Sequence, residues 1–180
     1  MRTSLLLAIL VPLAFPGAAP AADRCQQEKP DQASREAGCA EDCAADCMDA
    51  AYYLEKGWGV SKDAARAARY YERACALGDK MSCLSLGRLL EKGGDGLKRD
   101  VPRAVAVYDK ACKADPNACV SLAHVLAEGG GGVKRDLGRA AALFETACQR
   151  GNKSACESQQ HVLQIACRKG DAAACKQRKP

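Results

Sequence analysis

The chain has 180 residues, of which only 4% are aromatic, and its formal net charge is +5. So few aromatic side chains argue against a globule built around one large core, whereas the abundance of helix-forming residues favours an all-α fold. Outside the last five residues the basic side chains are interspersed with acidic ones, so the sequence lacks the basic stripe of a nucleic-acid-binding protein.

The first 22 residues have the pattern of a signal peptide. Arg2 precedes an apolar stretch, residues 5–15, which is shorter than the roughly 20 residues needed to span a bilayer. Small residues at Ala19 and Ala21 predict cleavage near Ala21 or Ala22. We therefore expect a secreted or periplasmic protein with no membrane span.

Twelve cysteines follow this segment, an even number that predicts a disulfide framework in an oxidising compartment. No C-x-x-C motif occurs, which argues against a thioredoxin-type redox site and against zinc knuckles. We expect neither a metal ion nor another cofactor.

Cysteines also mark an internal repeat, because Cys47, Cys83, Cys119 and Cys156 are separated by 36, 36 and 37 residues. This period divides the chain after the signal peptide into five segments. They are an N-terminal capping segment at 23–46, repeats at 47–82, 83–118 and 119–155, and a truncated C-terminal capping repeat at 156–180.

Each full repeat predicts two helices joined by a glycine-rich loop. The first helix has a small residue four positions after its cysteine and a leucine seven positions after it, on one helical face. A glycine ends this helix and is expected in the left-handed conformation: Gly57, Gly93 and Gly129. An aspartate then caps the second helix: Asp63, Asp100 and Asp136.

The second helix carries an aromatic residue that we expect to fill the core between alanines: Tyr71, Tyr108 and Phe144. New N-caps at Asp79, Asp115 and Asn152 begin the next repeat. The last repeat lacks the glycine loop, which predicts one continuous helix over about 154–168 and a short helix capped by Asp171.

The order of small residue, leucine, Gly-x-Gly-Val-x-x-Asp, alanine, aromatic and alanine resembles the Sel1-like repeat, a relative of the tetratricopeptide repeat. Residues 57–63, GWGVSKD, match the loop motif closely, and repeats two and three have one extra loop residue that we expect to leave the helices unchanged. The added cysteine pair resembles the cysteine-rich proteins of the Helicobacter type. The resemblance covers residues 39–175 and implies a right-handed α/α solenoid of helical hairpins stapled by disulfides.

Four disulfides are expected to join the last turn of one repeat's second helix to the first turn of the next helix, with Cα atoms about 5.5 Å apart. These pairs are Cys75–Cys83, Cys112–Cys119, Cys148–Cys156 and Cys167–Cys175. Cys25, Cys39, Cys43 and Cys47 allow three connectivities, of which we favour Cys39–Cys47 with Cys25–Cys43. The alternative is a metal-binding stripe of thiolates at Cys39, Cys43 and Cys47, since the spacing i, i+4, i+8 places them on one helical face.

Two functions remain open. The first is a scaffold that binds a protein or peptide partner on the concave face of the solenoid, where first helices lie in such folds. The second follows from the resemblance to the cysteine-rich branch, which implies binding or weak hydrolysis of β-lactams. The sequence itself shows no S-x-x-K, K-T-G or S-D-N motif and only two histidines, His124 and His161, so it identifies no catalytic residue.

Candidate binding residues are those on or beside the first helices that vary between repeats: Tyr52, Tyr53, Trp58, Arg88 and His124. Glu55, Glu91 and Glu128, near the end of each first helix, are expected to be surface residues. We expect a monomer whose partner is a protein or peptide, with a cell-wall peptide or a β-lactam as alternatives.

Overall fold

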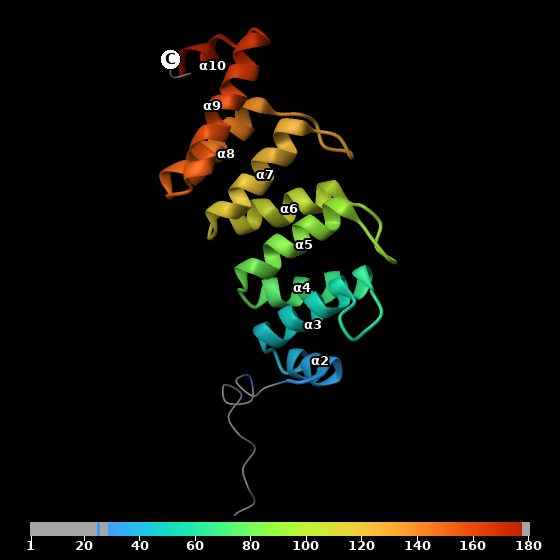
Figure 1. Ribbon diagram of the computed structural model, residues 1–180. Coiled ribbons are helices and arrows are strands. Elements are labelled where there is room, and N and C mark those ends of the chain that lie inside the picture. The colour runs from blue at the N-terminus through green and yellow to red at the C-terminus, as the bar shows by residue number, and fades with distance from the viewer. Residues whose placement is uncertain (1–24, 26–28, 178–180) are drawn as a thin grey trace, which may run out of the picture.

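The computed structural model describes Cys25 and residues 29–177, and this part consists of helices joined by turns and loops (Figure 1). The helices are α2 (Gln32–Ala40), α3 (Ala44–Lys56), α4 (Ala64–Ala76), α5 (Lys80–Lys92), α6 (Val101–Cys112), α7 (Pro116–Glu128), α8 (Leu137–Gln149), α9 (Lys153–Arg168) and α10 (Ala172–Gln177). Nowhere in the described part is a helix long and apolar enough to cross a membrane. The predicted signal peptide lies outside the described residues.

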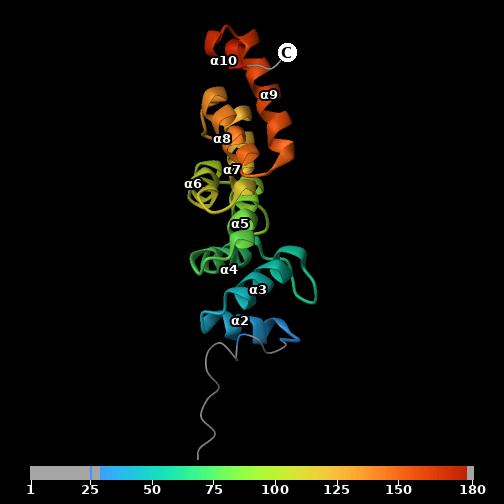
Figure 2. The ribbon, with the colours of Figure 1, turned by 90° about the vertical axis from the view of Figure 1, so that its left-hand side faces the viewer.

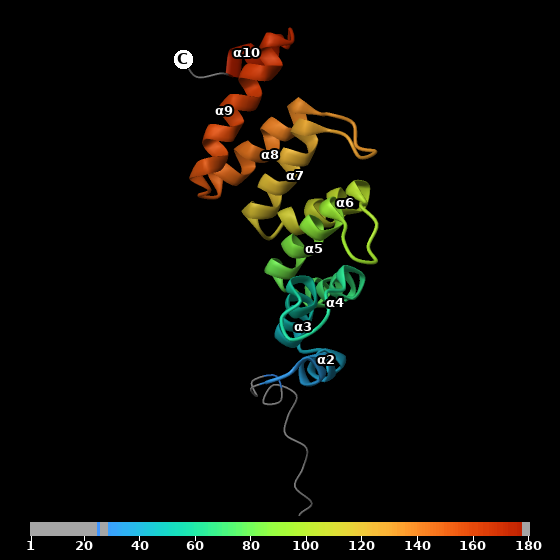
Figure 3. The ribbon, with the colours of Figure 1, turned by 45° about the vertical axis from the view of Figure 1, so that its right-hand side comes forward.

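Each helix packs against the next one along the chain, and the helices form an elongated stack that rises from α2 to α10 (Figure 1, Figure 3). Turned by 90°, the stack is narrow, with α2 and α10 at its opposite ends (Figure 2). The predicted all-α solenoid of helical hairpins is confirmed. Because contacts run between neighbours, the fold has no single centre, and each hairpin completes the core of the next.

The predicted caps begin the helices. The carboxylates of Asp63, Asp100 and Asp136 accept hydrogen bonds from the backbone N–H three residues on, at 2.8, 3.0 and 2.9 Å. Asp79 and Asn152 cap α5 and α9 through the N–H three residues on, the latter with its amide oxygen, and Asp115 caps α7 through the N–H of Asn117, two residues on. Each cap satisfies one of the N–H groups that a helix start leaves without a partner.

The glycines that end the first helices differ from the prediction in two of three repeats. Gly57 is left-handed, with φ 75° and ψ 32°. Gly93 and Gly129 also have positive φ, but their ψ values are −172° and −171°, an arrangement that essentially only glycine adopts. The extra loop residue is absorbed by β-bridges, Gly94 with Leu97 and Gly130 with Val133, so the flanking helices keep their places.

The aromatic residue of each second helix is the largest core side chain of its repeat. Tyr71, Tyr108 and Phe144 are at most 1% exposed. The backbone of α5 approaches Tyr108 so closely that a Cβ at Gly87 would lie 2.2 Å from its ring. The repeat therefore needs its small residue at this position because the aromatic ring of the paired helix occupies the space.

Six disulfides join all twelve cysteines, and none remains a free thiol. Five of them connect adjacent helices across a short turn, with Cα–Cα distances of 4.5–4.9 Å, shorter than the expected 5.5 Å. The four N-terminal cysteines pair as Cys25–Cys43 and Cys39–Cys47. Because α2 ends at Ala40 and α3 begins at Ala44, these cysteines do not share one helix, and the alternative thiolate stripe is absent.

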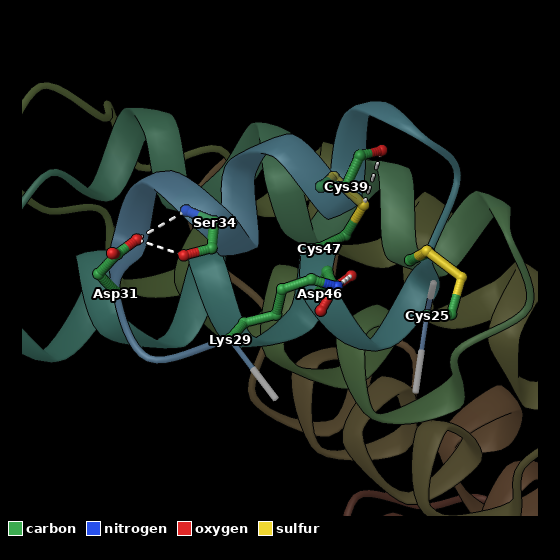
Figure 4. Close-up of polar contacts among 8 residues, drawn as sticks. Cys25, Lys29, Asp31, Ser34, Cys39, Asp46 and Cys47 are labelled. Atoms are coloured by element: carbon green, nitrogen blue, oxygen red, sulfur yellow. Dashed lines mark hydrogen bonds and ion pairs between the residues drawn. A yellow bond between two sulfur atoms is a disulfide. The ribbon is translucent and has the colours of Figure 1, made fainter. Parts of the chain in front are cut away.

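The N-terminal cap contains two buried charged residues, Arg35 and Asp46, and Figure 4 shows Lys29 beside Asp46. Helix α2 takes the place of a second helix, and Arg35 stands four residues before its cysteine, as Tyr71 does in α4. Arg35 is buried, with its guanidinium 4.0 Å from the centre of the Tyr53 ring. Buried Asp46 pairs with Lys29 at 2.9 Å and fills the space beside Gly38.

Candidate functional site

A groove of about 650 Å³ lies between α3 and α5 and is called here the α3–α5 groove. Both helices are first helices of their repeats, and Tyr71 of α4 lies beneath them. The side chains of α3 that line it are Met48, Asp49, Tyr52, Glu55 and Lys56. Those of α5 are Met81, Ser85, Arg88, Leu89 and Lys92. The sequence repeat places equivalent residues at the same position of each first helix. Tyr52 and Arg88 each stand five residues after their cysteine, and they line the groove together.

The floor of the groove is held by a buried hydroxyl. The Tyr71 hydroxyl donates to Glu55 Oε2 at 2.9 Å. Burial, and then the hydrogen bond to Glu55 and its charge, raise the pKa of Tyr71 far above its usual value, while the Ser85 hydroxyl acts in the opposite direction. Tyr71 is thus a neutral donor that fixes the Glu55 carboxylate at the groove wall.

Large apolar side chains are exposed mainly at this groove. Among the described residues the exposed large hydrophobics are Tyr52, Trp58, Leu77 and Met81. Tyr52 and Met81 line the groove, and Trp58 packs edge-on against Tyr52 with ring centres 5.2 Å apart. Aromatic residues, methionine and arginine are the types enriched in protein interfaces, which makes this groove the candidate binding site.

A second groove of about 630 Å³, the α7–α9 groove, lies two repeats further along. His124 of α7 and His161 of α9 line it at the position of Tyr52 and Arg88. His124 packs edge-on against Phe144 on the groove floor, with ring centres 5.0 Å apart. Glu128, Arg135 and Glu157 supply the charges at this groove.

The structure therefore divides the predicted binding residues. Tyr52 and Arg88 lie in the α3–α5 groove with Trp58 at its edge, whereas His124 belongs to the α7–α9 groove. Tyr53 packs against Arg35 of the N-terminal cap and also edge-on against Trp58. The described residues include no group of three or more side chains arranged to hold a metal ion.

Glu55, Glu91 and Glu128 are not equivalent, although each lies near the end of a first helix. Glu55 and Glu91 stand eight residues after their cysteines, but Glu128 stands nine after its cysteine, at the position of Lys56 and Lys92. Glu91 accepts a hydrogen bond from the Tyr108 hydroxyl at 2.6 Å, as Glu55 does from Tyr71. In the third repeat Phe144 and Ala127 occupy the two positions, so hydroxyl and carboxylate are lost together. The joint loss of both residues in the third repeat could have revealed from the sequence that the tyrosine and the glutamate pair.

The sequence model of the Sel1 repeat matches residues 44–79, 80–116 and 116–152. A crystal structure of a Sel1 repeat protein from Oxalobacter formigenes is 27% identical, with a TM-score of 0.61, and the match covers 73% of this chain and 54% of that one. The protective antigen c5321 of uropathogenic Escherichia coli strains, which displays an SLR fold, is 19% identical with a TM-score of 0.62, over 81% of this chain and 30% of that one.

Helicobacter pylori cysteine rich protein B is 31% identical, with a TM-score of 0.45, over 49% of this chain and 66% of that one. The chain thus spans about half of the Oxalobacter protein and a smaller part of the Escherichia coli antigen. No curated protein matches the sequence significantly.

Proposed function

This chain belongs to the Sel1 repeat family, and from that premise we propose that it is a scaffold that binds a segment of a partner protein in the α3–α5 groove. Sel1 repeats typically mediate protein interactions, and stacked helical repeats present extended surfaces for them. The six disulfides indicate an oxidising, extracytoplasmic location. We further propose that residues 1–22 act as a signal peptide and are removed by cleavage.

The main support for this proposal is that exposed apolar side chains gather at one groove. Tyr52, Trp58 and Met81 would cost free energy by remaining in water, and all three lie at one groove rather than scattered over the surface. Arg88 stands in the same groove as a planar donor for carboxylates or carbonyls. A partner segment that covers these four side chains would bury the surface from which hot spots are usually built.

The alternative, β-lactam hydrolysis, has no comparable support. Ser85 lines the α3–α5 groove beside the Tyr71 hydroxyl and Ser158 lines the α7–α9 groove, but within the described residues no hydrogen bond joins either serine to a histidine or a lysine. A serine hydrolase needs a base within hydrogen-bond reach of its nucleophile. Both grooves are therefore better explained as binding surfaces.

Site-specific photocrosslinking in the cell that makes the protein tests this proposal. A photoreactive amino acid replaces Met81 in the groove and, as the matched control, Leu77, which is also exposed but lies outside the groove. We expect one discrete adduct from position 81 that is absent from position 77 and is lost when Tyr52 and Arg88 are changed to Ala. Identical adducts from both positions would contradict the proposal.

A β-lactam assay separates the two functions. The purified protein and a Tyr52→Ala, Arg88→Ala, His124→Ala variant are mixed with nitrocefin, and we expect no turnover above background from either. Clear hydrolysis by the wild type that the triple change abolishes, with the helical content intact, would make the grooves an active site.

A further inference from the structure

Of the two carboxylates that line the α3–α5 groove, Glu55 is directly engaged by the protein, whereas Asp49 forms no hydrogen bond or ion pair within the described residues. Glu55 accepts the Tyr71 hydroxyl and pairs with Lys56 Nζ at 2.6 Å. Asp49 is partly buried, which raises its pKa, and the buried guanidinium of Arg35 acts in the opposite direction by attracting its charge. The side chains that line the groove therefore carry two negative charges, on Asp49 and Glu55, against three positive charges on Lys56, Arg88 and Lys92.

Most of the basic side chains in the groove form no ion pair with other described residues. Lys56 is shared between Glu55 and the face of the Tyr52 ring, 5.4 Å from its centre. Arg88 and Lys92 are exposed, and within the described part of the chain neither forms a hydrogen bond or an ion pair. The groove thus carries a net positive charge, with the exposed cations Arg88 and Lys92 beside Leu89.

The methionines and the lysines occupy different ends of the groove. Helices α3 and α5 run in the same direction, because each is antiparallel to α4 between them. Met48 and Met81 lie near the N-terminal ends of these helices, and Lys56 and Lys92 lie at their C-terminal ends. A ligand that fits both ends carries bulky apolar side chains next to carboxylates.

We propose that the α3–α5 groove selects an acidic segment of its protein partner, in which bulky apolar side chains contact Met48, Met81 and Tyr52 and carboxylates pair with Arg88 and Lys92. The inference rests on the proposed function, since it names the class of segment that the same groove binds. Charge complementarity of this kind sets specificity and speeds association more than it adds affinity.

The α7–α9 groove provides a contrast within the same molecule. Glu128 takes the position of Lys56 and Lys92, and Glu157 adds a second carboxylate against Arg135. This groove is not positive in the way that the α3–α5 groove is, so an acidic segment should not bind there. Reversing the charge of basic residues should therefore weaken binding of an acidic segment at the α3–α5 groove and have little effect at the α7–α9 groove.

Fluorescence anisotropy with two synthetic peptides tests the inference. One peptide alternates Asp or Glu with Phe or Leu and has an amidated C-terminus, and its twin has Lys at every acidic position. We expect the acidic peptide to bind the wild type about tenfold more tightly than its twin, as two exposed charge pairs would give. Its affinity should fall as NaCl is raised.

The decisive variant is Arg88→Glu with Lys92→Glu, which should invert the preference between the peptides. Its matched control is Arg69→Glu with Lys110→Glu, the same change in net charge at exposed positions of α4 and α6, which should preserve the preference. Circular dichroism checks that both variants keep their helices. A charge-reversed variant that still prefers the acidic peptide would overturn the inference.

Other outcomes separate this inference from the proposed function. If both peptides bind equally and Tyr52→Ala with Met81→Ala abolishes their binding, charge selection is wrong and the groove remains a docking site. If neither peptide binds, the acidic segment is wrong and the photocrosslinking result alone decides the proposed function. Displacement of the acidic peptide by benzylpenicillin would likewise overturn a protein segment as the occupant.

Discussion

Single residues set how closely the helices approach, and Gly87 does so most clearly. Replacement of Gly87 by Ala would place a methyl group 2.2 Å from the Tyr108 ring. Overpacking of this kind costs roughly 1–3 kcal/mol and exceeds the gain in helix propensity of about 1 kcal/mol. We therefore expect Gly87→Ala to lower the free energy of unfolding, measured by urea denaturation.

The control for that change is Gly138→Ala in α8. Here a Cβ meets only the Asp136 side chain at 3.7 Å, an ordinary contact. The same substitution should therefore be neutral or stabilising by up to about 1 kcal/mol. Equal destabilisation at both sites would show that packing against Tyr108 is not the cause.

The buried tyrosines predict a dependence of stability on alkaline pH. Burial, and then hydrogen bonding to Glu55 or Glu91, raise the pKa of Tyr71 and Tyr108 above the unfolded value of 10.0. Below that pH both states are neutral, and above it the unfolded chain ionises while the folded protein resists, so stability is lost as the pH rises. A Tyr71→Phe, Tyr108→Phe variant should lose less stability than the wild type between about pH 8 and about pH 11.

Urea midpoints at the two pH values measure this difference, with Tyr52→Phe as the control because its side chain is exposed. The comparison is between losses within each protein, so a constant cost of removing the hydroxyl cancels. A double variant as sensitive to alkali as the wild type would mean that neither hydroxyl is held in its neutral form.

At the scale of helices, the disulfides act as local staples. Cys112 and Cys119 join α6 to α7 across seven residues, with Cα atoms 4.5 Å apart. Replacing both by Ser should lower the free energy of unfolding by about 2–4 kcal/mol, because the unfolded chain regains the entropy of a closed loop. Hydrogen exchange should accelerate mainly in α5–α8. Equal acceleration in α2 and α3 would contradict a local effect.

Peptide mapping without reduction checks the pairs themselves. Digestion should yield Cys112 linked to Cys119 and the other five couples. A bond between distant repeats would refute the register of the whole stack.

Much of each helix could be predicted from the sequence because caps, glycine stops and core positions are properties of one helix. Asp63 and Asp100 cap as expected, and Tyr71 is buried as expected. The ion pairs between consecutive repeats were not predicted, because they depend on how one repeat packs on the next. Arg103 and Arg139, each three residues after its cap, pair with Glu72 and Asp109 of the preceding second helix at 2.8 and 2.6 Å.

The candidate site was predictable only in part for the same reason. Helical periodicity placed Tyr52 and Arg88 on first helices, but the α3–α5 groove arises from the distance between two such helices and from Tyr71 beneath them. Arg35 was missed because an arginine at the position of a core aromatic has no signal in the pattern of apolar residues. Its role becomes visible only once Tyr53 is seen to cover it.

At the scale of the whole molecule, a destabilising change in one repeat should affect the adjacent helices more than the distant ones. Phe144 is buried in the third repeat, and Phe144→Ala removes a core side chain whose loss typically costs about 3–5 kcal/mol. Because α8 packs against α7 and α9, hydrogen exchange should accelerate in these helices and remain slow in α2–α4. The α3–α5 groove should keep its affinity for a partner.

The reciprocal variant makes this a test of the solenoid. Tyr71→Ala should accelerate exchange in α3–α5 and leave α8 and α9 protected, since α4 packs mainly against α3 and α5. Uniform acceleration in both variants would mean that the stack unfolds as one cooperative unit. In that case a partner bound in the α3–α5 groove would stabilise the α7–α9 groove as well, since ligand binding stabilises every element that unfolds with its site.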